Sequence, residues 1–114
     1  MLHREPGAET VEAAMEEGAL STVNWSEVYE RLLHRGIDVD GVRVDVEALG
    51  LEIVPFTADD AERAAQLAPP TRGIGLSLGD RACLALADRL SLPALTADRS
   101  WLGLDLGVAI QPIR

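Results

Sequence analysis

Three acidic residues lie at positions where their side chains could meet. Glu27 lies in the first turn of a helix expected after a strand at 20–23, and Asp98 directly follows a strand at 94–96. Asp80 lies in the first turn of a long apolar helix that leads into that second strand. Because crossover helices run antiparallel to the strands of a parallel α/β sheet, all three positions reach the carboxyl edge of the sheet, where ligands bind. The sequence therefore predicts a cluster of carboxylates at this edge.

A cluster of carboxylates calls for a cation, because neighbouring carboxylates repel one another and resist desolvation. Mg²⁺ or Mn²⁺ takes oxygen ligands and keeps several waters, and such a metal can assist phosphodiester cleavage by activating water. Each acid also has a structural interpretation. Glu27 and Asp80 fit capping boxes opened by Asn24 and Ser77, and Asp98 could cap a turn. The spacing alone leaves both interpretations open.

The elements that must position these acids alternate between helix and strand over a single domain, residues 1–114. Apolar periodicity, caps and breakers predict helices at 9–17, 24–36, 38–49, 57–68 and 77–90, strands at 20–23, 51–56, 93–96 and 108–113, and a turn at 98–102. Pro55 suggests an edge position for the strand at 51–56. This alternation favours a three-layer α/β fold with a central, mainly parallel sheet.

Composition excludes several classes of protein. The net charge is −9 and all ten basic residues are arginine, so bulk charge cannot hold RNA, and metal ions with a local arginine cluster would have to do so. No apolar stretch approaches the roughly 18 residues of a membrane span, so we expect a cytoplasmic protein that does not bind membranes. Cys83, the only cysteine, has no apparent histidine partner and is expected to be a buried thiol. Gly73 and Gly75 form no phosphate-binding loop of the Walker type.

Three sequence blocks resemble the later motifs of PIN-domain proteins of the VapC toxin type. These blocks are NWSEV at 24–28, SLGDRACLALA at 77–87 and LTADRSW at 95–101. The resemblance implies an endoribonuclease toxin of a type II toxin–antitoxin module that cleaves RNA with Mg²⁺ or Mn²⁺. It implies a cognate antitoxin that covers the site, and a homodimer. The residues that match metal ligands and catalytic acids are Glu27, Asp80 and Asp98, and those that match supporting polar positions are Ser77 and Thr96.

The N-terminus departs from the family pattern. Family members open with an apolar strand that ends in an Asp, followed by a segment that resembles LHREPGAETV, which here begins at Leu2. That strand is central in the family's sheet, so we expect unpaired strand edges to face each other between 20–23 and 94–96. We hypothesise that Met1 is an internal methionine and that the domain as given is incomplete at this end. The alternative is a catalytically inactive PIN remnant that acts as a protein-binding module.

Four further side chains could meet RNA. Arg81 and Arg99 neighbour two of the acids and could contact phosphates, although surface ion pairs are the favoured interpretation. Trp25 and Trp101 could stack on bases. Packing in the core or at an interface is favoured for both tryptophans.

Overall fold

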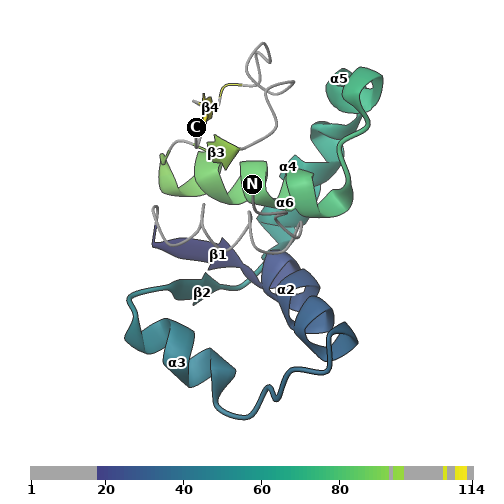
Figure 1. Cartoon of the computed structure of the whole chain (residues 1–114). Coiled ribbons are helices and arrows are strands. Elements are labelled where there is room, and N and C mark those ends of the chain that lie inside the picture. The colour runs from purple at the N-terminus through teal and green to yellow at the C-terminus, as the bar shows by residue number, and fades with distance from the viewer. Residues whose placement is uncertain (1–17, 93, 97–106, 108–109, 113–114) are drawn as a thin grey trace.

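A computed structural model describes residues 18–92, 94–96, 107 and 110–112 (Figure 1). The expected helix at 9–17 and the turn at 98–102 lie outside these residues. The strands are β1 (Ala19–Ser21), β2 (Glu52–Val54), β3 (Ala94–Thr96) and β4 (Ile110–Pro112). The helices are α2 (Thr22–His34), α3 (Val42–Ala48), α4 (Ala58–Gln66), α5 (Ala68–Thr71), the 3-10 turn η1 (Arg72–Ile74) and α6 (Leu78–Leu90).

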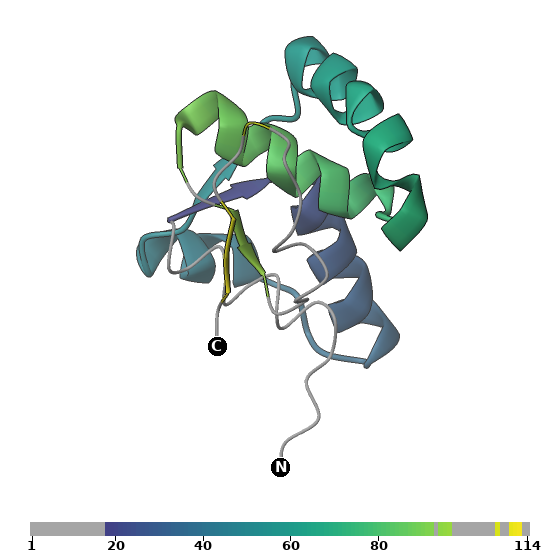
Figure 2. The same cartoon turned by 90° about the horizontal axis from the view of Figure 1, so that it is seen from above.

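The strands form two parallel pairs. β1 pairs with β2, with Leu20 opposite Ile53, and β3 pairs with β4, with Leu95 opposite Gln111. Within the described residues no ladder joins β1 to β3. Figure 2 shows that the two pairs run in different directions, and Figure 1 shows them at different levels with α6 between them. The parallel pairing confirms the α/β prediction, and β1 and β3 are the two strands between which we expected unpaired edges to face each other.

Helix α6 covers one face of the β1–β2 pair. Successive side chains of a strand point to opposite faces, so Ala19 and Ser21 share a face, as does Val54, which lies opposite Ser21. Ala19 and Val54 form a buried cluster with Leu86 of α6. α6 also contacts β3. This helix therefore contacts both strand pairs.

The opposite face of the β1–β2 pair is covered by α2 and α3. Leu20 of β1 and Leu51 are each 4% exposed. They are packed by Trp25 of α2, Val46 of α3 and Ile53 of β2. A helix layer thus lies on each side of this pair, with α6 on one side and α3 on the other, as the three-layer prediction requires.

The prediction that α6 is a buried helix is confirmed. Leu84 is fully buried and packs with Leu67, at the end of α4, and with Ala87. The helix buries these residues: Gly79, Ala82, Leu84, Ala85, Leu86 and Ala87. Cys83, expected to be buried, is half-buried. Complete burial of a leucine side chain such as that of Leu84 contributes about 1.5–3 kcal/mol.

The expected start of α2 is wrong. The helix begins at Thr22, because Ser21 is its N-cap and accepts a hydrogen bond from the Val23 N–H at 3.2 Å. β1 consequently ends two residues earlier than expected. Asn24, which was expected to open a capping box with Glu27, is not the cap, since it lies inside the helix. Glu27 therefore lies in the second turn and not in the first.

Two other boundaries also differ from expectation. The helix expected at 38–49 begins only at Val42, because Gly41 precedes it in a left-handed conformation with φ 76°. Pro69 and Pro70 do not end α4, which stops at Gln66. They lie in the first turn of the short helix α5 instead, where the missing N–H of proline is tolerated.

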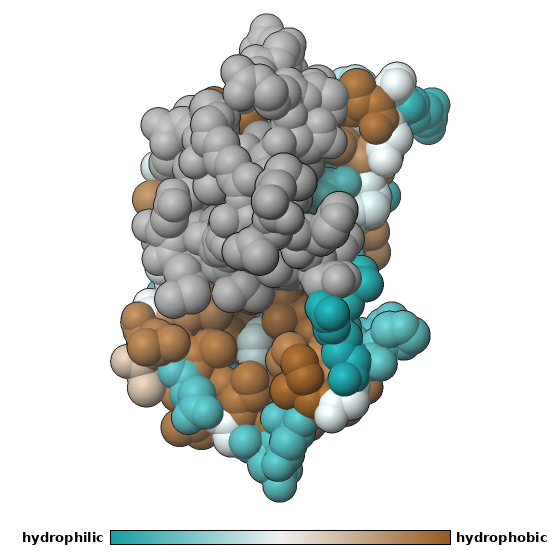
Figure 3. Space-filling view, in the orientation of Figure 1, coloured by the Kyte–Doolittle hydropathy of each residue, from teal (hydrophilic) through white to brown (hydrophobic). Residues whose placement is uncertain are grey.

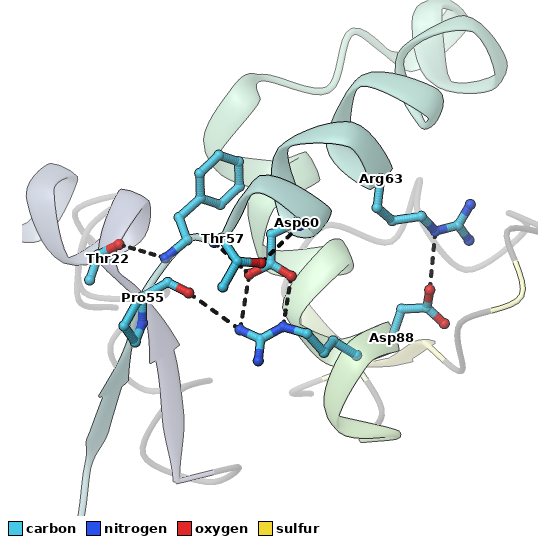
Figure 4. A network of polar contacts seen from close by, with 8 residues as sticks. Thr22, Pro55, Thr57, Asp60, Arg63 and Asp88 are labelled. Carbon is cyan, nitrogen blue, oxygen red and sulfur yellow. Dashed lines mark hydrogen bonds and ion pairs between the residues drawn. The ribbon is translucent and has the colours of Figure 1, made fainter.

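A network of polar contacts fastens α4 to α6 (Figure 4). Thr57 and Asp60 form a capping box at the start of α4. Arg89 of α6 donates to both carboxylate oxygens of Asp60, at 2.8 and 3.0 Å, and to the Pro55 carbonyl. A more exposed pair, Arg63 with Asp88, joins the same helices.

In the described residues no helix is long and apolar enough to cross a membrane.

Candidate functional site

The carboxylate of Glu27 lies against the first turn of α6. A Cβ atom built on Gly79 would come within 2.6 Å of the Glu27 carboxylate carbon, closer than real side chains approach. The absence of a side chain at Gly79 is therefore what makes room for this carboxylate. Gly79 is also the residue immediately before Asp80, so the fold brings two of the three predicted acids to the same helix end.

Asp80 is held in place by a reciprocal pair of hydrogen bonds. The Ser77 N–H donates to Asp80 Oδ2 at 3.0 Å, and the Asp80 N–H donates to Ser77 Oγ at 3.1 Å. This capping box fixes the rotamer of Asp80 at the start of α6 and confirms the structural interpretation of the Ser77–Asp80 spacing. It uses one carboxylate oxygen only. Asp80 can therefore cap the helix and still offer an oxygen to a ligand.

The described part of the site holds two acids and not three. Asp98, the third predicted acid, lies outside the described residues, as do Arg99 and Trp101. Thr96 is the last residue of β3, which places its backbone at the carboxyl end of that strand. No group of three metal-ligating side chains occurs among the described residues.

The oxygen donors of this pair suit a hard divalent cation. Within the described residues, only one oxygen of each carboxylate accepts a hydrogen bond: Glu27 Oε1 from Asn24 and Asp80 Oδ2 from Ser77. The remaining oxygens are the ligands that Mg²⁺ and Mn²⁺ prefer. The residues present thus fit such an ion.

Sequence reasoning missed the role of Asn24. This residue was interpreted as a helix cap, yet it is 3% exposed and donates from Nδ2 to Glu27 Oε1 at 3.2 Å and to the Gly79 carbonyl at 2.9 Å. It therefore ties α2 to α6 beneath the acids. The spacing of Asn24 and Glu27, three residues apart on a helix, was the available signal, because such residues are neighbours on one face.

Arg81 and Trp25 have contacts that favour structural roles. Arg81 is half-buried and donates from Nη1 to the carbonyl of Ala64 at 2.9 Å, so it links α6 to the last turn of α4. Trp25 packs against the Leu20–Leu51 cluster and edge-to-face against Tyr29, with ring centroids 6.1 Å apart. Core packing, the favoured interpretation of Trp25, is confirmed.

The fold and the acids together define a class of protein: an α/β domain with parallel strands whose carboxylates gather beside the start of a buried helix. The sequence matches the PIN domain family over residues 1–105, so the chain belongs to this family. PIN domains are generally metal-dependent nucleases that act on RNA, which indicates a nuclease-type function. No curated protein matches the chain.

Proposed function

We propose that this protein is an Mg²⁺- or Mn²⁺-dependent endoribonuclease, the toxin of a type II toxin–antitoxin module that acts in the cytoplasm. The observation that carries the proposal is that the Glu27 carboxylate lies against Gly79, next to Asp80 in the first turn of α6. The chain that shows this arrangement belongs to the PIN family. The VapC-type blocks around Glu27, Asp80 and Asp98 support the toxin assignment.

Glu27, Asp80 and Asp98 would hold the metal. Once bound, the ion supplies an activated water and stabilises negative charge on the phosphate. The chain's own contribution is orientation. Ser77 holds Asp80 through the capping box, and Gly79 leaves space for Glu27. Thr96 and Arg99 are proposed to support the acids and to contact RNA phosphates, respectively. For Arg81, the bond to Ala64 favours the structural role over the contact with RNA.

Removal of the metal should abolish activity. Purified protein incubated with a fluorescent RNA oligonucleotide should cleave it in Mg²⁺ or Mn²⁺ and stop when EDTA is added, because the ion supplies the activated water and stabilises the charge on the phosphate. Restoration by excess Mg²⁺ is the control for irreversible damage. Cleavage that persists in EDTA would contradict the proposal, since it would come from a metal-independent or contaminating nuclease.

Gly79→Ala should damage the site without damaging the helix. The new methyl group would occupy the place of the Glu27 carboxylate and push this flexible side chain aside. We expect Mn²⁺ binding to weaken about tenfold or more, while the melting temperature stays the same or rises, because alanine favours a helix over glycine by about 1 kcal/mol. Calorimetric Mn²⁺ titration and thermal melting measure the two effects.

Gly73→Ala is the matched control, since a Cβ at Gly73 would meet no atom within 4 Å. It should leave Mn²⁺ affinity unchanged. Equal Mn²⁺ affinities of the Gly79→Ala protein and the wild type would show that Glu27 does not need its position against Gly79 to bind metal.

Exposed apolar side chains support the proposal that this protein binds protein partners. Four large apolar residues between the end of α2 and the end of α3 are 47–71% exposed: Leu33, Ile37, Val44 and Leu49. Figure 3 shows apolar residues gathered over the part of the molecule where α2, α3, β1 and β2 lie. Apolar surface of this kind marks interaction sites. A cognate antitoxin and a second copy of the chain are the proposed partners.

The same apolar surface also fits a second candidate function. A catalytically inactive PIN domain that only binds a partner protein would expose the same residues. The two functions differ in what divalent cations do: an inactive module would bind Mn²⁺ weakly or not at all and leave RNA intact, whereas the nuclease requires both binding and cleavage.

A further inference from the structure

Asn24 occupies an unusual position for an amide side chain. It is 3% exposed, deep between α2 and α6, and its two acceptors come from different elements. Glu27 lies one turn further along α2, and the Gly79 carbonyl belongs to the first turn of α6. A side chain that packed only for its volume would need neither contact.

The orientation of the Asn24 amide follows from its neighbours. Nδ2 lies 3.2 Å from Glu27 Oε1 and 2.9 Å from the Gly79 oxygen, and both of these atoms can only accept. Exchanging Nδ2 and Oδ1 would place an oxygen against two oxygens, so the nitrogen must face the pair. The amide therefore donates both of its protons at the point where the Glu27 carboxylate meets α6.

Oδ1 of Asn24 is the complementary observation. It is buried, and within the described residues it accepts no hydrogen bond. A buried acceptor without a partner is destabilising, so such an atom in a folded protein calls for an explanation. Retaining an amide here at that cost indicates that the two donated bonds matter more than the packing that an apolar residue of the same shape would give.

Glu27 needs such a fixed partner because it is otherwise exposed. A free glutamate samples many rotamers, and the conformational entropy lost when one rotamer is fixed opposes ligand binding. Asn24 binds Oε1, and the carboxylate packs against Gly79. The second oxygen, Oε2, is therefore held in one orientation. We propose that Asn24 is a positioning residue, which orders the Glu27 carboxylate beside α6 so that Oε2 can bind a divalent cation. This inference rests on the proposed metal-dependent function.

The test is a double-mutant cycle on Mn²⁺ affinity, with Asn24→Leu, Glu27→Gln and the double variant measured by calorimetry well below their melting temperatures. Asn24→Leu should weaken Mn²⁺ binding about ten- to a hundredfold, as the loss of residues that orient metal ligands does. In the Glu27→Gln background the same change should have no further effect. Equal weakening in both backgrounds, or none in either, would overturn the proposal, because a purely structural role would not depend on Glu27.

A second measurement uses the native asparagine and no metal. The side-chain amide protons of Asn24, observed by NMR, should shift upfield in Glu27→Gln, because their acceptor loses its charge. Unchanged Asn24 signals would overturn the positioning role even if Asn24→Leu failed to fold. Failure of the proposed function looks different: wild-type protein would then neither bind Mn²⁺ nor cleave RNA, whatever the Asn24 signals do.

Discussion

Glu27→Gln should reduce Mg²⁺-dependent RNA cleavage by at least about a hundredfold while the protein remains folded, since it removes a charged ligand of the ion that performs the chemistry. Glutamine keeps the shape of the side chain and can still accept the hydrogen bond from Asn24. Glu27 is exposed, so the free energy of unfolding should change by less than about 0.5 kcal/mol. Initial rates on an RNA oligonucleotide and thermal melting measure the two quantities.

Asp80→Asn should have the same effect on cleavage. Asparagine can still accept from the Ser77 N–H, so the start of α6 should persist with a small loss of stability. Ser77→Ala separates the two roles of this acid: it removes the hydroxyl that caps α6 and costs about 1 kcal/mol, but keeps the Asp80 carboxylate.

Glu30→Gln is the matched control for Glu27→Gln. It makes the same change of charge on an exposed glutamate one turn further along α2, and no hydrogen bond or ion pair joins Glu30 to the described residues of α6. Its cleavage rate should equal that of the wild type. If Glu30→Gln and Glu27→Gln lowered the rate equally, overall charge and not a site would be responsible, and the assignment of Glu27 would be wrong.

Local signals in the sequence were enough to predict α6 and the acid at its start. Ser77 and Asp80 are three residues apart, and both partners of the capping box lie within one turn. The apolar residues that follow Asp80 indicated that the helix is buried, without reference to any other element. The start of α4 carries a box of the same kind, because Thr57 and Asp60 are also three residues apart.

The start of α2 could not be predicted in this way, because Ser21, Asn24 and Ser26 are all good N-cap residues. The choice depends on contacts with distant segments: Asn24 is buried against Gly79, 55 residues away in the chain. The same distance in sequence hid the role of Asn24. The convergence of Glu27 with Asp80 was predictable from topology, but the opening that Gly79 provides was not, since a glycine in a helix has many explanations.

Arg89→Met should be more destabilising than the loss of any other ion pair among the described residues. It would leave the Asp60 carboxylate, whose side chain is 3% exposed, without its cation. Removing one partner of a buried pair costs about 3–5 kcal/mol. Arg89 itself is 35% exposed, and solvent screening reduces this to about 2 kcal/mol. For a domain of this size the melting temperature should fall by about 10 °C.

Asp88→Asn is the control, because it breaks the neighbouring pair with Arg63, in which both side chains are about a third exposed. It should cost less than about 1 kcal/mol. If both variants melted at the same temperature, the Asp60–Arg89 pair would be no more than a surface contact.

The pH dependence distinguishes a charge effect from a loss of packing. The hydrogen bond from Arg89 holds the pKa of Asp60 below its ordinary value of 3.8. A carboxyl whose pKa is lower in the folded state stabilises the fold above the unfolded pKa, and this stabilisation is lost as the pH falls through the folded value. The difference in melting temperature between wild type and Arg89→Met should therefore be constant near neutral pH and shrink below about pH 4. A difference that persists undiminished in acid would mean that Arg89 stabilises the α4–α6 contact through its aliphatic stem and not through its charge.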